Sequence, residues 1–181
     1  MLTGAGVAFE AEDAGVDEDA IKAALPDHAP ADLAMELAKA KALAVSQREG
    51  NAWVLGSDQV LAFDGGLVSK ARTLAEARTR LSAMRGRTHA LHSAVALAHG
   101  GSVVWSGVDT ARMEMRGFSD AFLGAYLAIE GEALLASVGA YRLEGMGAQL
   151  FERVEGDYFT VLGMPLWPVL AELRRVGVIA T

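Results

Sequence analysis

The sequence contains no cysteine, no long apolar run and fewer basic than acidic residues. Without cysteine the chain forms no disulfide bond, no zinc–thiolate site and no thiol nucleophile, which fits a cytoplasmic protein. The net charge of −7 argues against a nucleic-acid polymer as partner, because such partners normally require a basic surface. A single nucleotide needs only a local group of lysines and a metal ion.

Membrane segments are also lacking. No run of about eighteen apolar residues occurs, and the start of the chain lacks the basic and apolar regions of a signal peptide. With 181 residues, of which 52% are hydrophobic and 22% charged, the composition is that of a soluble globular protein. We therefore expect a single domain over residues 1–181 with no membrane partner.

The stretch richest in chemistry is Gly56-Ser57-Asp58-Gln59, which follows the apolar run 53–55. That run predicts the start of a buried strand, and the later Asp64-Gly65 is a strong hairpin signal. We expect Asp58 at the end of its strand, where open α/β sheets tend to place chemistry. The return strand then brings Lys70 back toward it. On pattern alone, a surface ion pair beside a hairpin is the commoner outcome.

Further motifs follow in a specific order and spacing. Together with the first stretch they are Gly56-Ser57-Asp58-Gln59, Lys70, Gly86-Arg87-Thr88-His89, Ser93-Ala94-Val95, Gly139-Ala140-Tyr141, Glu144-Gly145, Gly156-Asp157-Tyr158 and Pro165-Leu166. This series resembles the Maf family of nucleoside triphosphate pyrophosphatases nearly from end to end. The family's first strand and its Ser/Arg phosphate loop have no counterpart here. Relative to the family we therefore expect either an N-terminally truncated form or a start at an internal methionine of a longer protein.

The resemblance implies an α/β fold like those of Maf proteins and inosine triphosphatase. An elongated mixed sheet with flanking helices and two lobes around a central cleft is expected. The implied reaction is hydrolysis of the α–β phosphoanhydride of a nucleoside triphosphate to the monophosphate and pyrophosphate, with Mg²⁺ or Mn²⁺ as cofactor. The resemblance also permits a homodimer.

The same resemblance assigns the catalytic residues, which are Asp58, Lys70 and Glu18. Asp58 is expected to act as the base and, with Glu18, to bind the divalent cation through hard oxygen ligands. Lys70 is expected to hold charge that develops on the leaving pyrophosphate. Without the resemblance, the sequence favours Glu18 as a solvated acid in a loop or a first helical turn.

The resemblance also implies substrate-binding roles for Lys41, Gln59 and Glu144. Lys41 is expected to contact phosphate, with a solvated helix lysine as the alternative. Gln59 with Glu144 resembles the branch acting on 7-methyl-GTP. A carboxylate suits such a substrate, because it accepts hydrogen bonds from the N–H groups of guanine and attracts a cationic base. For Glu144 the alternative is a turn acid. For the whole chain the alternative is a catalytically impaired nucleotide-binding or cell-division-associated protein.

Local signals predict most of the secondary structure. We expect a helix that starts at Pro30-Ala31-Asp32, with Asp32 as its cap, and ends near Gln47, with Leu33, Leu37, Ala40, Leu43 and Ala44 as its apolar stripe. A capping box of Thr73 with Glu76 opens the next helix, whose buried face is Ala77, Leu81 and Met84. The turn Gly100-Gly101 joins two long strands, 88–98 and 103–116.

The final third of the chain continues in the same way. Ser119 is expected to cap a helix with Phe122, Tyr126 and Ile129 on its core face. Residues 159–162 are expected to form a strand and 166–175 a closing helix. His89 and His92 fall on opposite faces of their strand, so no histidine metal site is expected.

Overall fold

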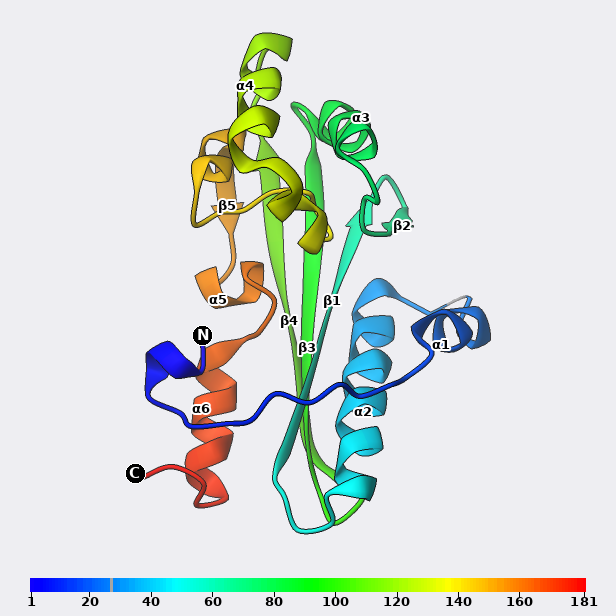
Figure 1. The fold of residues 1–181 in the computed structure, drawn as a ribbon, viewed down its shortest axis with the longest axis vertical. Helices are drawn as coiled ribbons and strands as arrows, with labels where there is room; N and C mark the ends of the chain where they lie inside the picture. The colour runs from blue at the N-terminus through cyan, green and yellow to red at the C-terminus, as the bar shows by residue number, and fades with distance from the viewer. Residues whose placement is uncertain (27) are drawn as a thin grey trace. The chain divides into compact units, whose positions relative to one another are not determined.

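Figure 1 shows the computed structural model, in which residues 1–26 and 28–181 are described. The strands are β1 (Val54–Phe63), β2 (Gly66–Val68), β3 (Thr88–His99), β4 (Ser102–Met115) and β5 (Phe151–Glu155). The helices are α1 (Glu18–Ala24), α2 (Pro30–Arg48), α3 (Leu74–Met84), α4 (Asp120–Glu130), α5 (Tyr158–Val161) and α6 (Leu166–Arg175), with short 3₁₀ turns η1 (Thr3–Ala5), η2 (Gly131–Ala136) and η3 (Met146–Leu150). The expected α/β class with flanking helices is confirmed.

The sheet has the strand order β2-β1-β3-β4-β5. Asp64 and Gly65, both with positive φ, form the expected hairpin turn, which leaves β1 and β2 antiparallel with Phe63 opposite Gly66. Strands β4 and β5 are also antiparallel. A two-residue turn such as Asp64-Gly65 can only return the chain antiparallel, and neither β1–β2 nor β4–β5 shows the parallel pairing that the predicted mixed sheet includes.

The chain divides into two compact units. The first comprises residues 1–59, 92–110 and 157–181, and the second comprises residues 60–91 and 111–156. Among the residues that the structure describes, no helix combines the length and apolar character needed to cross a bilayer. The single domain over residues 1–181 and the central cleft stay predictions.

In the first unit, α6 supplies much of the core. Its bounds match the predicted closing helix, and its buried residues pack against β3 and Val7. The packed set is Val7, Val95, Leu97, Leu166, Val169, Leu170 and Leu173. The spacing of the helix members at three and four residues places them on one face, so the helix is held by one apolar stripe.

Helix α2 begins at Pro30, where the predicted helix starts, but its cap differs from the prediction. Its N-cap is Ala29 and Pro30 occupies the first helical position, so Asp32 lies within the first turn and is not the cap. Proline suits that position because its fixed φ is helical and its missing N–H has no partner there anyway. The acidic Asp32 still stabilises the helix through its N-terminal dipole.

The buried face of α2 also differs from the predicted stripe. Leu33 and Leu37 are buried as expected, but the face continues through Ala38 and Ala42, whereas Ala40, Leu43 and Ala44 are only half-buried. Alanines face the sheet because a glycine of β1 lies opposite them, as described below. Small side chains on both elements permit a close approach.

The second unit contains helix α3, whose predictions are confirmed. Thr73 accepts a hydrogen bond from the Glu76 amide, and the Glu76 carboxylate accepts one from the Arg72 amide. The buried residues are the predicted Ala77, Leu81 and Met84.

In α4, the Ser119 cap is confirmed by its hydrogen bond from the Phe122 amide. The predicted core face is wrong at two of three positions. Tyr126 is buried, but Ile129 is 68% exposed and Phe122 is half-buried, while Leu123 and Leu127 take their places. The real stripe is rotated by one position, since Leu123, Tyr126 and Leu127 also satisfy three- and four-residue spacing.

The predicted strand 159–162 is wrong, because this segment is the short helix α5. The Asp157 side chain accepts a hydrogen bond from the Phe159 amide and so caps a helical turn. A short apolar run does not distinguish a strand from a buried helical turn, and the local cap decides between them.

His89 lies in the interior of the second unit. Its side chain Nε2 is 2.7 Å from the Tyr141 hydroxyl, and its ring also packs near Phe151. Within the described residues, Nδ1 has no hydrogen-bond partner. Burial away from water lowers the pKa of His89 from 6.5 to about 4, so the ring is neutral at physiological pH.

The buried ring predicts an acid-sensitive stability. Between pH 6.5 and about 4, the unfolded chain binds a proton at His89 that the folded chain does not. The free energy of unfolding is therefore highest above pH 6.5 and decreases as the pH falls through this range. The expected loss is about 3 kcal/mol. Urea denaturation across this range should show it, and the His89→Gln variant, which has no titrating ring, should show a shallower fall. Parallel pH profiles for the two proteins would contradict the prediction.

Candidate active site

The site in the first unit begins with a close approach of β1 and α2, which Figure 1 shows beside each other. A Cβ atom on Gly56 would fall on the carbonyl oxygen of Ala38 and would lie 2.6 Å from the amide nitrogen of Ala42. Only glycine allows this contact. Because Lys41 precedes Ala42, and Asp58 lies two residues beyond Gly56 on the same face of the strand, the contact brings lysine and aspartate together.

Asp58 does not lie at the end of its strand, as expected from the sequence. Strand β1 runs from Val54 to Phe63, so Asp58 lies in its middle. The strand continues because the following residues pair with β2, with Leu61 opposite Val68. Asp58 is therefore flanked on both sides by residues of the same β-strand.

Lys41 connects two of the predicted carboxylates. Its Nζ lies 2.6 Å from Asp58 Oδ1 and 2.7 Å from Glu18 Oε1. Glu18 occupies the first turn of α1, where Asp17 caps the helix by accepting from the Ala20 amide. The structure thus brings together three predicted site residues, Glu18, Lys41 and Asp58, which we call the Lys41 cluster.

The environments of the two carboxylates push their pKa values apart. Burial raises the pKa of Asp58, and its bond from Lys41 offsets this only in part. For Glu18 the hydrogen bond from Lys41 dominates over burial and lowers the pKa. Burial favours the neutral form of Lys41, but its bonds to Asp58 and Glu18 outweigh this and raise its pKa. Such separation is typical of an acid–base site.

The donor set of the Lys41 cluster fits a divalent cation. The oxygens of Glu18 and Asp58 converge on one positive charge, the Lys41 ammonium. Within the described ranges, no three His, Cys, Asp or Glu side chains form a metal cluster. Two carboxylates without a full protein cage are the usual arrangement for Mg²⁺, which takes its other ligands from water and substrate phosphates.

Gln59 points to the other face of β1 from Asp58. Its amide nitrogen donates to Ser93 Oγ at 2.9 Å and lies 3.0 and 3.1 Å from the carbonyl oxygens of Thr160 and Val161. The Ser93 hydroxyl donates in turn to the Thr160 carbonyl. The two carbonyls can only accept, so the amide nitrogen must face them. Among the residues that the structure describes, the side-chain oxygen of Gln59 has no hydrogen-bond partner.

Ser93 and Thr160 are therefore part of the site. Ser93 lies in one of the motifs that resemble the family but was assigned no role, and Thr160 was not singled out. Both are fully buried. A serine inside the apolar strand 88–98 was the signal for Ser93, because a buried hydroxyl needs a partner. Nothing in the sequence pointed to Thr160, whose segment was expected to be a strand.

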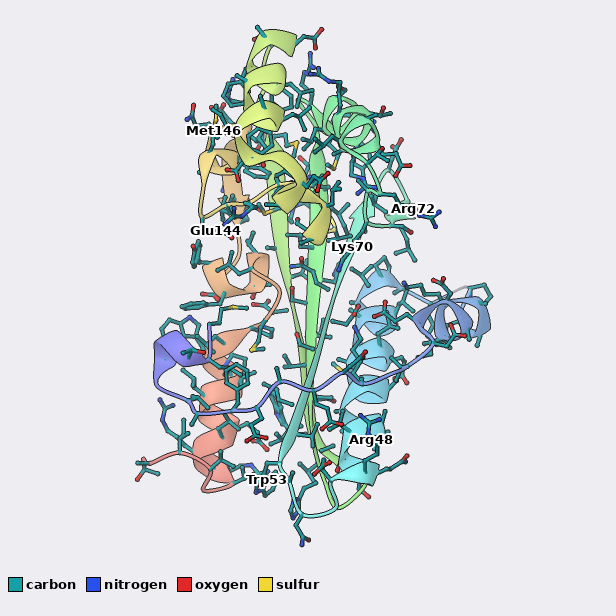
Figure 2. All side chains as sticks on the ribbon, in the orientation of Figure 1. Arg48, Trp53, Lys70, Arg72, Glu144 and Met146 are labelled. Atoms are coloured by element: carbon teal, nitrogen blue, oxygen red, sulfur yellow. The ribbon has the colours of Figure 1, made fainter. Side chains whose placement is uncertain are left out.

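Lys70 and Glu144 belong to the second unit. Lys70 is exposed on the segment between β2 and α3, as is the neighbouring Arg72 (Figure 2). Among the described residues it has no salt-bridge partner. Glu144 is exposed in the loop before η3, with Oε1 3.4 Å from Arg142 Nε. That Lys70 and Glu144 act in one active site with the Lys41 cluster stays a prediction.

The loop that carries Glu144 is well anchored. The Arg142 amide donates to the Tyr126 hydroxyl, and the Arg142 guanidinium pairs with the nearly buried Glu130 carboxylate at 3.3 Å. Glu130 also accepts from the amide of Met146. Glu144 thus lies in a loop that is anchored on both sides of it, by Tyr126, which was expected only as a core residue, and by Glu130, which no sequence pattern singled out.

Comparison with known proteins gives a consistent result. Residues 1–176 match the sequence profile of a family described as Maf-like protein. A Caulobacter vibrioides protein named nucleoside triphosphate pyrophosphatase is 51% identical over 179 residues, which cover 98% of this chain and 89% of the relative. Proteins named 7-methyl-GTP pyrophosphatase from Rhizobium meliloti and Mesorhizobium japonicum are 47% and 49% identical, each over 99% of this chain and 91% of the relative.

Proposed function

The chain belongs to the Maf-like protein family, and from this premise we propose that it is a nucleoside triphosphate pyrophosphatase. It would cleave the α–β phosphoanhydride and release the nucleoside monophosphate and pyrophosphate. The observation that carries the proposal is the Lys41 cluster, in which one ammonium lies within 2.7 Å of two carboxylates. Relatives of about half identical sequence are named for this activity.

Asp58 is the proposed catalytic base. Burial raises its pKa, which makes its carboxylate a stronger base than an ordinary aspartate. It would accept the proton of the water that attacks a phosphorus atom of the anhydride, as the bond to the bridging oxygen breaks. Lys41 and Lys70 would neutralise phosphate charge, Lys70 on the leaving pyrophosphate.

A divalent cation, Mg²⁺ or Mn²⁺, is part of the proposal. Glu18 and Asp58 would hold it, since their oxygens already share one cationic partner. When bound, the ion would neutralise phosphate oxygens and act as a Lewis acid at the reacting group. Glu18 suits this role because its lowered pKa keeps it ionised.

For the base, the proposal is a guanine type such as 7-methyl-GTP. Both amide hydrogens of Gln59 face protein acceptors, so Gln59 would offer only its oxygen to a base. Glu144 would offer a carboxylate. Guanine presents N–H donors to such acceptors, and a methylated cationic base adds charge attraction.

Replacing Glu144 by glutamine should weaken this preference. A charged hydrogen bond contributes about 1.5–3 kcal/mol, so we expect kcat/KM for 7-methyl-GTP relative to UTP to fall roughly tenfold or more. Glu132→Gln, in an exposed acid of η2, is the matched control. An unchanged substrate ratio in the Glu144 variant would remove Glu144 from base selection.

The activity itself is tested by pyrophosphate release. The chain would be assayed with Mg²⁺ or Mn²⁺ against the common triphosphates and 7-methyl-GTP, with the Lys41→Met variant alongside. We expect metal-dependent release that this variant loses. Nucleotide binding by calorimetry without any release would instead favour the alternative of a nucleotide-binding protein. A cytoplasmic location and a homodimer, both expected from the sequence, stay predictions.

A further inference from the structure

The segment that leads to Glu18 is held mainly by side chains. Residues 8–16 form neither helix nor strand, and most of them are exposed. Figure 1 shows this segment running from η1 across to α2 and α1. Among the described residues, it makes no hydrogen bond from main chain to main chain. The position of Glu18, which follows in the first turn of α1, therefore depends on what holds residues 8–16.

Arg48, at the end of α2 (Figure 2), binds this segment with its whole guanidinium group. Its Nη2 donates to Glu12 Oε1 at 2.6 Å and to the Asp13 carbonyl at 2.8 Å, and its Nη1 donates to the Ala14 carbonyl at 3.2 Å. Its Nε donates to the same Glu12 oxygen at 3.2 Å. A planar group that engages all three of its nitrogens fixes the orientation of its partners.

The chain between this contact and Glu18 is short. The Gly15 amide donates to Asp13 Oδ1 at 2.9 Å, and Gly15 turns the chain with a φ of 65°, a value that glycine adopts readily. Glu18 lies four residues beyond Ala14, at most about 14 Å of extended chain. A displacement at the Arg48 contact is therefore passed on to Glu18.

Arg48 and Lys41 act on this part of the chain from one side of α2. They are seven residues apart, which is about two helical turns or roughly 10.5 Å along the helix axis. Lys41 Nζ lies 2.7 Å from Glu18 Oε1, while Arg48 binds residues 12–14. The two basic side chains thus hold both ends of the segment 12–18, which runs antiparallel to α2.

We propose that Arg48 is a positioning residue for Glu18, the carboxylate that would hold the divalent cation. When Glu18 exchanges its Lys41 partner for the cation, the Arg48 contact keeps the main chain of residues 12–14 against α2 and so keeps Glu18 within reach of Asp58. The inference rests on the proposed function for the role of Glu18. Groups that orient a metal ligand typically change metal affinity by about 10–100-fold.

Replacing Arg48 by methionine should weaken the use of metal and leave the chemistry intact. We expect the Mg²⁺ concentration for half-maximal pyrophosphate release to rise about tenfold, with kcat at saturating Mg²⁺ changed by less than about twofold. Excess Mg²⁺ should restore activity, which it would not do if the variant were partly unfolded. Arg48→Lys should behave like Arg48→Met, because one ammonium does not reproduce the planar set of donors.

Lys39→Met is the matched control. It removes an ion pair within the same helix, in which Lys39 Nζ lies 2.9 Å from Glu36 Oε1. Among the described residues, this ammonium pairs only with Glu36. The Mg²⁺ dependence of the control should match that of the unmodified chain.

A spin label tests the contact without substrate or metal. The chain has no cysteine, so Ala11→Cys, beside the contacted residues, accepts a single nitroxide. The electron paramagnetic resonance lines of this label report motion on the nanosecond scale. They should narrow when Arg48→Met is added and stay unchanged when Lys39→Met is added.

The outcomes separate the inference from the proposed function. A label equally mobile with and without Arg48, or an Mg²⁺ dependence that Arg48→Met leaves unchanged in an active enzyme, would overturn the inference alone. An unmodified chain that releases no pyrophosphate at any Mg²⁺ concentration would contradict the proposed function and, with it, the role of Glu18 on which the inference rests.

Discussion

Replacing Asp58 by asparagine is expected to lower kcat for pyrophosphate release by about 10²–10⁴-fold, the usual contribution of a general base. Asparagine keeps the shape of the side chain but cannot accept a proton from water. The fold should persist, because Lys41 retains Glu18 at 2.7 Å as a partner. Steady-state kinetics and thermal denaturation would measure the two effects separately.

The pH profile gives the same residue a second test. Because burial raises the pKa of Asp58, the acid limb of kcat should lie above that of an ordinary aspartate. Asp64→Asn is the matched control, since it makes the same change at an exposed turn position and should leave kcat intact. Equal activity of Asp58→Asn and the unmodified chain would exclude Asp58 as the base.

Replacing Gly56 by alanine is expected to destabilise the protein by about 2–4 kcal/mol, at the upper end for overpacking a core. The added methyl group would meet main-chain atoms of Ala38 and Ala42. Main-chain atoms inside a helix cannot turn aside as a side chain can, so α2 must shift away from β1. Urea denaturation would measure the loss.

The same change should also lower activity in the remaining folded protein. A shift of α2 moves Lys41 relative to Asp58, and small displacements in a site are costly to catalysis. Gly50→Ala is the control, because an added Cβ there meets no atom within 4 Å and the substitution should be nearly neutral. Equal stability of the two variants would show that the close approach is not required.

Local signals predicted several elements well. The Asp64-Gly65 hairpin follows from two neighbouring residues that tolerate positive φ. The start of α3 follows from Thr73 and Glu76, which satisfy main-chain groups within one turn. In each case the interactions that decide the structure lie within a few residues, so the sequence contains them directly.

Predictions from the sequence failed where two arrangements fit the apolar pattern equally well and only burial in the folded protein decides between them. Residues 122–129 of α4 hold two overlapping apolar stripes, and the neighbouring elements select the one containing Leu123 and Leu127. The segment 158–161 is apolar enough for a strand, and its Asp157 cap makes it a helix. Periodicity alone does not choose in either case.

By itself, the sequence determined the family, the α/β class and the residue types of the site, because motif order and composition do not depend on packing. Only the tertiary structure decided that Lys41 pairs with Asp58, 17 residues later, and with Glu18. It also decided that the amide of Gln59 binds Ser93, 34 residues away. The contact of Lys41 with Asp58 arises because Gly56 lets α2 lie directly on β1, and such an approach depends on how the whole core packs.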